Sequence, residues 1–584
     1  MKRVKIVARA VLISAVTITP IAIVANSATV SHAAAAAVYY VAPNGSDSAA
    51  GTLAAPWASI AHAQAVAAAG DTVYFRGGTY AYTRANSSCS SQTGRVDAIT
   101  LNKSGSSGSP IRYWAYPGEK PVFNFARMTD DCRIKGFDVT GNYIHLKGLE
   151  VTGVPQTNNL NHESWGIWIS GSNNTFEQIN THHHMGPGLF ISGGGGDLVL
   201  NSDSHDNYDQ HSSNGAGESG DGFGSHYTPA GSPANVFRGC RAWNNSDDGF
   251  DLISTYAPVT IENSWAWKNG YIPGTTTSSG NGNGFKVGGF GGDYDAGAVK
   301  HTVRFSVAFA NKAAGFYSNH HPVANDYFNN TGYGNHPDFN MLGIDSSGAA
   351  VGRGNLRNNI AYTGTLTSNL TGASSAYNSW DLGVTLSDSQ FQSVSTSGWD
   401  AARQGDGSLP ALPYLHPTAN SAVIDKGTNV GLPYTGQAPD LGAFEQPGTS
   451  TPPAAAQRYE AETAPAVCQG TIDSNQAGFS GTGFCNGNAA AGAYAQFTVT
   501  ASAAGPATLG VRFANGASGG TARPANLIVN GTTVATVSFE STGAWTTWLT
   551  KTLTASLNAG SNTIRLDPTT AGGIPNIDYL DTDG

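Results

Sequence analysis

A short glycine-centred phrase recurs through the middle of this 584-residue chain and restricts the folds that the chain can adopt. Its glycines stand 22, 34, 27, 35 and 31 residues apart, and the copies are 165–168, 187–190, 221–224, 248–251, 283–286 and 314–317. Units of this length cannot bury an apolar core alone, so they stack on one another. The spacing therefore predicts a solenoid.

If the copies stack in register, the fourth position of each phrase forms one ladder along the solenoid. That ladder reads Trp168, Phe190, Gly224, Asp251, Lys286 and Tyr317. Neighbouring strands lie about 4.8 Å apart, so Asp251 and Lys286 are expected side by side on one face. An acid and a lysine on a rigid repeat surface indicate a site rather than a scaffold.

The strands expected between the phrases alternate with period two and end in asparagine. Such runs cover 199–207, 236–245, 259–269, 303–311 and 327–330. Asparagine tolerates left-handed turns and can form hydrogen-bonded ladders. Because regularly placed hairpin signals are missing, a parallel β-helix is favoured over a propeller. A helix is expected over 61–69, where it would cap the open end of the solenoid.

The composition agrees with a large all-β protein. Only 12% of the residues are charged, and 74 are glycine. A solenoid is expected over 38–445, followed by a Pro/Thr/Ala linker at 446–457. Residues 458–584 repeat alternating strands and turns in a pattern typical of a β-sandwich.

The first residues have the pattern of a secretory signal peptide. Lys2, Arg3, Lys5 and Arg9 precede an apolar run, and small residues follow near Ala33. Assigning 1–37 to this leader predicts a secreted protein with no membrane span. Without those four positive charges, the net charge of -10 becomes about -14. This balance argues against a nucleic-acid partner, and nothing indicates more than a monomer.

The chain has five cysteines, and an exported protein permits disulfides. Cys468 and Cys485 are close in sequence and are expected to pair. Cys89 and Cys132 lie in polar, loop-like contexts and form a second candidate pair. Cys240 lies in an alternating strand and is expected to be a buried free thiol.

Four aspartates fall on neighbouring rungs of the predicted solenoid: Asp221 on one, and Asp247, Asp248 and Asp251 on the next. One Asp-Asp-Gly is usually a solvated turn. Four crowded acids are unfavourable unless a cation neutralises them. Carboxylate oxygens in this number are typical Ca²⁺ ligands.

Lys286 follows on the next rung, among uncharged neighbours in the sequence. A lysine beside Ca²⁺ and partly desolvated is expected to hold its proton less tightly and to act as a base. A metal with a lysine base suits β-elimination in a uronic acid polymer, where the metal binds the C6 carboxylate and acidifies the C5 proton. Calcium would also let an acidic protein hold an acidic polymer.

The run from Cys240 to Leu252, followed by Gly284-Phe285-Lys286, resembles polysaccharide lyase family 9, as do 40–47 and 70–73. Members are right-handed parallel β-helix pectate lyases, and the resemblance covers about 38–445. It implies calcium ligation by Asp221, Asp247, Asp248 and Asp251, with Lys286 as the catalytic base. The implied substrate is pectate or polygalacturonate of the plant cell wall, cleaved to 4,5-unsaturated oligogalacturonides.

The C-terminal unit resembles family 35 carbohydrate-binding modules at 459–462, 481–484, 542–545 and 575–580. The resemblance implies a structural calcium held by Glu460, Glu462 and Asp578. It also implies a sugar contact by Asn576, with Trp545 and Arg523 as further candidates. A tryptophan at such a place can instead be buried between sheets.

Several alternatives stay open at this point. A β-helix polygalacturonase would need two carboxylates as acid and base, and Arg133-Ile134-Lys135 resembles a tripeptide of that family. The polymer could be another uronate, such as alginate, or the protein could bind wall polysaccharide without catalysis. A zinc site at His182-His183-His184 is disfavoured because consecutive strand residues cannot all face one ion. His226 and His301 could border the groove.

Overall fold

The computed structural model describes residues 36–83, 89, 94–213, 215–446, 457–501, 505–517 and 521–582. Most of the predicted leader at 1–37 and of the predicted linker at 446–457 lies outside these residues. No helix in the described ranges is long and apolar enough to cross a membrane.

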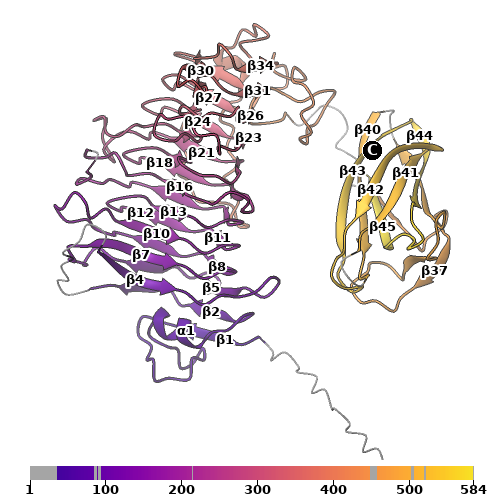
Figure 1. Ribbon diagram of the computed structural model, residues 1–584, viewed down its shortest axis with the longest axis horizontal. Helices are drawn as coiled ribbons and strands as arrows, with labels where there is room; N and C mark the ends of the chain where they lie inside the picture. Colours follow the sequence, from indigo (N-terminus) through magenta and orange to yellow (C-terminus); the bar gives the residue numbers. More distant parts are fainter. Residues whose placement is uncertain are drawn as a thin grey trace, which may run out of the picture.

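Three parallel sheets form the N-terminal unit (Figure 1). Sheet A has twelve strands: β1 (Val38–Val41), β2 (Thr72–Phe75), β5 (Ile111–Ala115), β8 (Ile144–Lys147), β11 (Thr175–Glu177), β14 (Leu198–Leu200), β17 (Asn235–Arg238), β20 (Val259–Glu262), β23 (Thr302–Arg304), β26 (Asp326–Phe328), β31 (Asn355–Arg357) and β34 (Ser374–Ala376). Sheet B carries the repeated phrases: β4 (Arg95–Leu101), β7 (Arg133–Val139), β10 (Trp165–Ile169), β13 (Leu189–Ser192), β16 (Phe223–His226), β19 (Phe250–Asp251), β22 (Phe285–Lys286), β25 (Phe316–Tyr317), β28 (Phe339–Asn340) and β33 (Thr367–Ser368).

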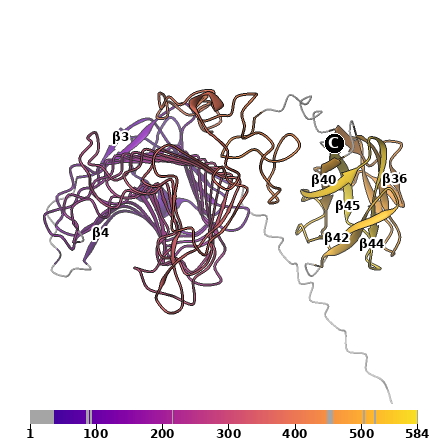
Figure 2. The ribbon, with the colours of Figure 1, turned by 90° about the horizontal axis from the view of Figure 1, so that it is seen from above.

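Sheet C completes each coil: β3 (Gly78–Ala81), β6 (Pro121–Asn124), β9 (Glu150–Thr152), β12 (Asn180–His182), β15 (Asp203–His205), β18 (Arg241–Trp243), β21 (Trp265–Trp267), β24 (Val307–Phe309), β27 (Thr331–Tyr333) and β32 (Ile360–Tyr362). Viewed from above, successive coils superpose (Figure 2). The predicted parallel β-helix is therefore confirmed. A short antiparallel pair, β29 (Leu342–Ile344) and β30 (Ala350–Gly352), lies beside the last coils.

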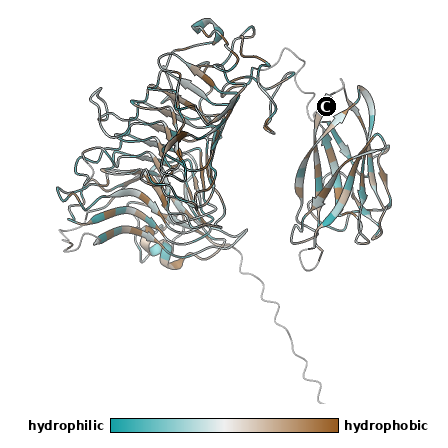
Figure 3. Cartoon of the chain, turned by 45° about the horizontal axis from the view of Figure 1, so that its top comes forward, coloured by the Kyte–Doolittle hydropathy of each residue, from teal (hydrophilic) through white to brown (hydrophobic). Residues whose placement is uncertain are grey.

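The third residue of each phrase builds the core. Phe223, Phe250, Phe285 and Phe316 are fully buried and stack ring on ring, with centroids 4.9–5.1 Å apart. Since side chains alternate across a strand, the fourth residue of each phrase faces outward. Figure 3 shows the resulting mixture of apolar and polar positions along the coils.

The glycine of each phrase is required by close packing. A Cβ on Gly249 would lie 2.6 Å from the carbonyl oxygen of Gly284 and 2.9 Å from Nδ2 of Asn269. That amide belongs to a buried ladder in which each Nδ2 donates to Oδ1 of the next asparagine at 2.9–3.1 Å: Asn207, Asn245, Asn269, Asn311 and Asn335. The predicted asparagine ladder is thus present.

The N-terminal end and one side of the solenoid are covered. Helix α1 (Ile60–Val66) begins at its N-cap Ser59, whose side chain accepts from the His62 N–H. It ends three residues before the expected position because Ala67 turns to extended backbone. The irregular segment 381–446, which contains the 3₁₀ turn η1 (Asp388–Gln390), packs on the aromatic rungs of sheet C. Arg403 of this segment forms an ion pair with Asp203 of β15, as Arg241 of β18 does, and so holds the segment on sheet C.

The C-terminal unit contains two antiparallel sheets. One contains β35 (Gln457–Glu460), β37 (Gly470–Asp473), β38 (Phe484–Gly487), β40 (Gly505–Ala514), β43 (Leu549–Leu557) and β45 (Asn576–Thr582). The other contains β36 (Val467–Cys468), β39 (Ala495–Ala501), β41 (Arg523–Val529), β42 (Thr532–Phe539) and β44 (Gly560–Pro568). They share an apolar core of their own, which confirms the predicted β-sandwich.

Disulfides join Cys468 to Cys485 and Cys89 to Cys132. Cys240 is free and buried.

Candidate active site

The strand register of sheet B reproduces the ladder expected from the phrases. Trp168 pairs with Phe190, Phe190 with Gly224, and Gly224 with Asp251. Asp251 then pairs with Lys286, and Lys286 with Tyr317. Since a one-residue slip would turn every side chain to the other face, this register alone places an acid and a lysine side by side outside the core.

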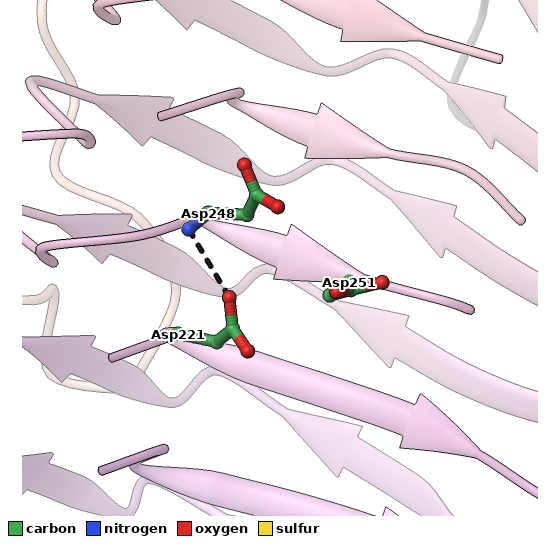
Figure 4. A group of neighbouring side chains, drawn as sticks. All are labelled: Asp221, Asp248 and Asp251. Carbon is green, nitrogen blue, oxygen red and sulfur yellow. Dashed lines mark hydrogen bonds between the residues drawn. The ribbon is translucent and has the colours of Figure 1, made fainter. Parts of the chain in front are cut away.

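Three of the four predicted acids meet on this face (Figure 4). Asp221, Asp248 and Asp251 each offer an oxygen within 4.8 Å of the others, and all three are buried. Asp221 Oδ1 accepts the Asp248 N–H at 3.1 Å, so the two rungs hold each other in place. No hydrogen-bond partner exists among the described residues for Asp248 Oδ2.

The carboxylate of Asp248 is fixed by a residue that the sequence reasoning did not select. Asn283 donates to Asp248 Oδ1 from its backbone nitrogen at 2.6 Å and from Nδ2 at 2.8 Å. Asn283 occupies the same position of its phrase as Asp221 and Asp248 do in theirs. That shared position is the sequence signal that could have identified it.

Asp247 lies beside the three-carboxylate group but is not a member of it. Its Oδ1 instead accepts the Asn281 N–H at 2.5 Å, and Asn281 Nδ2 donates to Glu218 at 2.8 Å. Asp247 therefore ties the loop before β22 to the rung. Its role as a calcium ligand stays a prediction.

The acids perturb one another strongly. Burial, together with the neighbouring carboxylates, raises the pKa of Asp221 and of Asp247 well above the usual range. Burial likewise raises the pKa of Asp248, although Lys286 opposes it. For Asp251, burial is outweighed by Lys286 and the pKa is lowered. Such clustering of like charges is typical of functional sites.

The uncharged sequence neighbours of Lys286 suggested that it has no ion-pair partner. In the structure it has two. Its Nζ lies 3.1 Å from Asp248 Oδ2 and 3.0 Å from Asp251 Oδ2. Burial alone would lower the pKa of Lys286, but the four carboxylates raise it well above its ordinary value. The expectation that Lys286 holds its proton less tightly beside Ca²⁺ stays a prediction.

The rung that carries Asp221 is shaped by a glycine at its ladder position. A Cβ on Gly224 would lie 2.5 Å from Cδ2 of Phe190, whose ring therefore lies over this position. The Phe190 ring contacts His226 with centroids 4.5 Å apart. His226 Nε2 lies 3.6 Å from Asp251 Oδ1, and burial lowers the pKa of the imidazole to about 4.

These residues fit a hard divalent cation such as Ca²⁺. The donors are carboxylate oxygens, Asp248 Oδ2 receives no hydrogen bond from the described residues, and the mutual repulsion of the carboxylates is relieved by a cation. Within the described ranges, no other three acidic, histidine or cysteine side chains, the module's Glu460, Glu462 and Asp578 included, bring their ligand atoms within 4.8 Å of one another. His182 and His205 instead stack at 4.8 Å, and His205 stacks on Trp243 at 4.1 Å, so these are ladder histidines.

The module's predicted calcium ligands lie around one loop. Ser480 donates to Glu460 Oε2 at 2.8 Å, and its backbone N–H donates to Asp578 at 3.0 Å. Glu462 Oε1 accepts the Thr482 N–H at 2.8 Å, whereas its Oε2 has no hydrogen-bond partner in the described structure. Burial raises the pKa of Asp578 to about 6.

The module's predicted sugar contacts line one pocket. Asn576, Trp545 and Arg523 surround a space of about 410 Å³. The Arg523 guanidinium lies 5.0 Å from the Trp545 ring centroid, and Trp545 is partly exposed rather than buried between the sheets.

The β-helix matches a known family over 39–359, the Pel9A-like right-handed β-helix region. The chain belongs to this family. Pectate lyase L of Dickeya chrysanthemi is 39% identical over 417 residues, covering 70% of this chain and 90% of that protein. The solved structure of pectate lyase Pel9A is 36% identical with a TM-score of 0.60, covering 70% of this chain and 96% of its own.

A second solved relative carries a different name. A rhamnogalacturonan lyase is 34% identical with a TM-score of 0.61, covering 65% of this chain and 96% of its own. The predicted recognition is confirmed: this chain is a polysaccharide lyase of the pectate lyase family. That assignment removes the hydrolase and non-catalytic alternatives, and it confirms the predicted right-handed sense of the solenoid.

The C-terminal unit matches a carbohydrate-binding module of family 6 over 460–583. Endo-1,4-beta-xylanase B of Cellvibrio japonicus is 48% identical over 118 residues, covering 20% of this chain and 19% of that protein. A solved CBM35 from Cellvibrio japonicus Abf62 is 43% identical, covering 22% of this chain and 94% of its own, with a TM-score of 0.22. The unit is a carbohydrate-binding module.

Proposed function

We propose that this protein is a secreted, calcium-dependent pectate lyase in which Lys286 removes the C5 proton of a galacturonate unit. One observation carries the proposal: a buried aspartate trio, whose members each offer an oxygen within 4.8 Å of the others, lies beside the only lysine that touches it in the described structure. Relatives named pectate lyase over 70% of the chain support the substrate.

The proposed reaction needs no pair of carboxylates acting as general acid and general base. Unprotonated Lys286 Nζ takes the C5 proton, the C5–H electrons form a C4=C5 double bond, and the C4–O4 bond breaks. The departing O4 takes a proton from water and becomes the hydroxyl of a new reducing end, while the other fragment carries a 4,5-unsaturated non-reducing end. Lys286 returns the C5 proton to the resulting hydroxide, so no water is consumed. Ca²⁺ held by Asp221, Asp248 and Asp251, with Asp247 beside them, would act as a Lewis acid on the C6 carboxylate and make the C5 proton more acidic.

The charge balance around Lys286 suits this role. Its raised pKa comes from the same carboxylates that would ligate the cation, while burial pulls the pKa down. Neutralising those carboxylates removes the upward cause and leaves the downward one. With those carboxylates neutralised by the cation, Lys286 would more readily lose its proton and could accept the C5 proton.

The remaining parts of the chain fit an extracellular enzyme on plant cell-wall pectate. The N-terminal leader pattern supports secretion, and we expect a monomer. The module, with Glu460, Glu462 and Asp578 around a structural calcium and Asn576, Trp545 and Arg523 in its pocket, would hold the enzyme on wall polysaccharide. An acidic protein would depend on calcium, not on bulk charge, to hold the acidic polymer.

A second substrate is favoured by one comparison. Since a solved relative of similar likeness is named a rhamnogalacturonan lyase, rhamnogalacturonan is the alternative polymer. It would need the same acid group and the same base, so the difference lies in the groove around them.

The test is the formation of the ultraviolet-absorbing double bond by the full chain, with Ca²⁺ or with a chelator. Polygalacturonate, rhamnogalacturonan and alginate are compared. A calcium-dependent rise on polygalacturonate is expected. A rise only on rhamnogalacturonan or alginate would change the substrate. New reducing ends without absorbance would overturn the elimination.

A further inference from the structure

His226 has no role in the proposed reaction, yet it lies on the same face as the acids. It is the last residue of β16, two positions after Gly224, so its side chain points outward with the ladder. Gly224 pairs with Asp251, which places the imidazole diagonally beside that carboxylate. Only 9% of the side chain is exposed.

The orientation of this ring is built by its neighbours. The Phe190 ring contacts it at 4.5 Å, and Tyr227 lies edge-on at 5.7 Å. Phe190 can reach His226 only because Gly224 has no side chain in between. Phe190, Gly224 and Tyr227 thus hold the imidazole in one place.

The ring nitrogen that faces the acids has an unmet hydrogen bond. His226 Nε2 is buried without a partner in the described structure and lies 3.6 Å from Asp251 Oδ1, just beyond bonding distance. Asp251 meanwhile accepts the Ile253 N–H through Oδ1 and binds Lys286 through Oδ2. If Lys286 is to act as a base, Asp251 must keep its orientation without that ion pair.

A direct bond from His226 to the cation is the less suitable role. Ca²⁺ prefers oxygen ligands, and imidazole nitrogen is a typical ligand of softer metals. Residues that hydrogen-bond to a ligating group, by contrast, orient it and tune the site.

We propose that His226 is a positioning residue whose Nε2–H donates to Asp251 Oδ1 and fixes that carboxylate toward the cation. The inference rests on the proposed function, since it assumes that Asp251 is a calcium ligand. It assigns Gly224 and Phe190 the task of placing the imidazole. It also explains how Asp251 stays oriented when Lys286 is released.

The experiment compares His226→Gln, which keeps an N–H donor, with His226→Phe, which keeps a ring of similar size and no donor. Ca²⁺ binding to the full chain is measured by calorimetry without substrate. Heat that survives in Asp251→Asn belongs to other sites, such as the module, and is subtracted. Thermal melts in chelator check the fold, and His226→Leu replaces His226→Phe if the latter does not fold.

His226→Phe is expected to weaken calcium binding about 10-fold or more, as is usual for residues that orient a ligand, while His226→Gln stays within about threefold. His205→Phe, in a stacked ring position of sheet C, is the matched control and is expected to bind as wild type does. Unchanged binding in His226→Phe, or equal loss in His226→Gln, would overturn the inference alone. Wild-type heat identical to that of Asp251→Asn would overturn the proposed function and the inference with it.

Discussion

Two polar ladders run through the same coils of this solenoid, and they differ in how completely their members are paired. In the asparagine ladder, each buried amide donates to the next asparagine and to a backbone carbonyl, as Asn269 does toward Asn311 and Ala242. In the aspartate group, carboxylates face carboxylates, and Asp248 Oδ2 receives no hydrogen bond from the described residues and is balanced only by its ion pair with Lys286. Both ladders follow from one strand register.

The difference separates scaffold from site. A fully paired buried network specifies the fold and has no capacity left for a ligand. Buried acids that repel one another destabilise the ion-free protein, and they are retained where a cation or a substrate completes them. The same backbone geometry therefore supports stability in one ladder and chemistry in the other.

The sharpest way to break the comparison is Lys286→Ala. Loss of a catalytic base is expected to lower kcat by about 10²–10⁴-fold on polygalacturonate. Calcium binding measured by calorimetry should persist, because the aspartates remain. Lys300→Ala, which removes a half-exposed lysine paired with Asp326, is the matched control and should keep full activity. Undiminished turnover in Lys286→Ala would reject the assignment of the base.

Asp248→Asn tests the unpaired side of the comparison. The substitution removes one charge from a crowded group, so activity at limiting Ca²⁺ should fall about 10–100-fold through lost metal affinity. In chelator the melting temperature should stay equal or rise, because repulsion is relieved. A large fall of the melting temperature in chelator would mean that Asp248 stabilises the fold and would place it with the asparagines.

Asn269→Ala tests the paired side. The side chain donates to Asn311 and Ala242 and accepts from Asn245, and its loss leaves buried groups unsatisfied. The free energy of unfolding of the β-helix should fall by about 2–3 kcal/mol, seen as a lower midpoint in denaturant. The gain of stability on adding Ca²⁺ should match that of the wild type. A lost calcium response would show that the two ladders are not independent.

The smallest expected effect is a pH dependence of calcium stabilisation. The pKa values of Asp221 and Asp247 are raised in the folded protein, so their contribution to stability is present below their unfolded pKa and is lost as pH rises through the folded values. In chelator, the free energy of unfolding should therefore fall as the pH rises through the folded pKa values. Calcium binding needs deprotonated acids and should strengthen over the same range. The rise of melting temperature caused by Ca²⁺ should be larger at high pH than at low pH. A pH-independent rise would contradict this.

The repeated phrase was enough to predict the strand register and the acid–lysine neighbours. The coils can stack in only one way. Side chains alternate with a period of two, the glycines fit beneath the asparagine ladder, and the phenylalanine of each phrase is buried. The ion pair of Lys286 with Asp251 is consistent with that register, but the uncharged sequence neighbours of Lys286 suggested that it had no salt-bridge partner. No local pattern predicts that Asp247 accepts the Asn281 N–H, or that the Phe190 ring packs against His226. Both contacts depend on how the loops run between the strands. The packing of 381–446 on sheet C likewise requires contacts between distant segments, such as Arg403 with Asp203.

The most direct test of the account is a crystal structure of the full chain grown with Ca²⁺. The account predicts one calcium ion ligated by Asp221, Asp248 and Asp251, with Lys286 Nζ no longer paired to Asp248, and an asparagine ladder unchanged from Asn207 to Asn335. A structure in calcium with no ion between these aspartates, and with Lys286 still bridging Asp248 and Asp251, would contradict it.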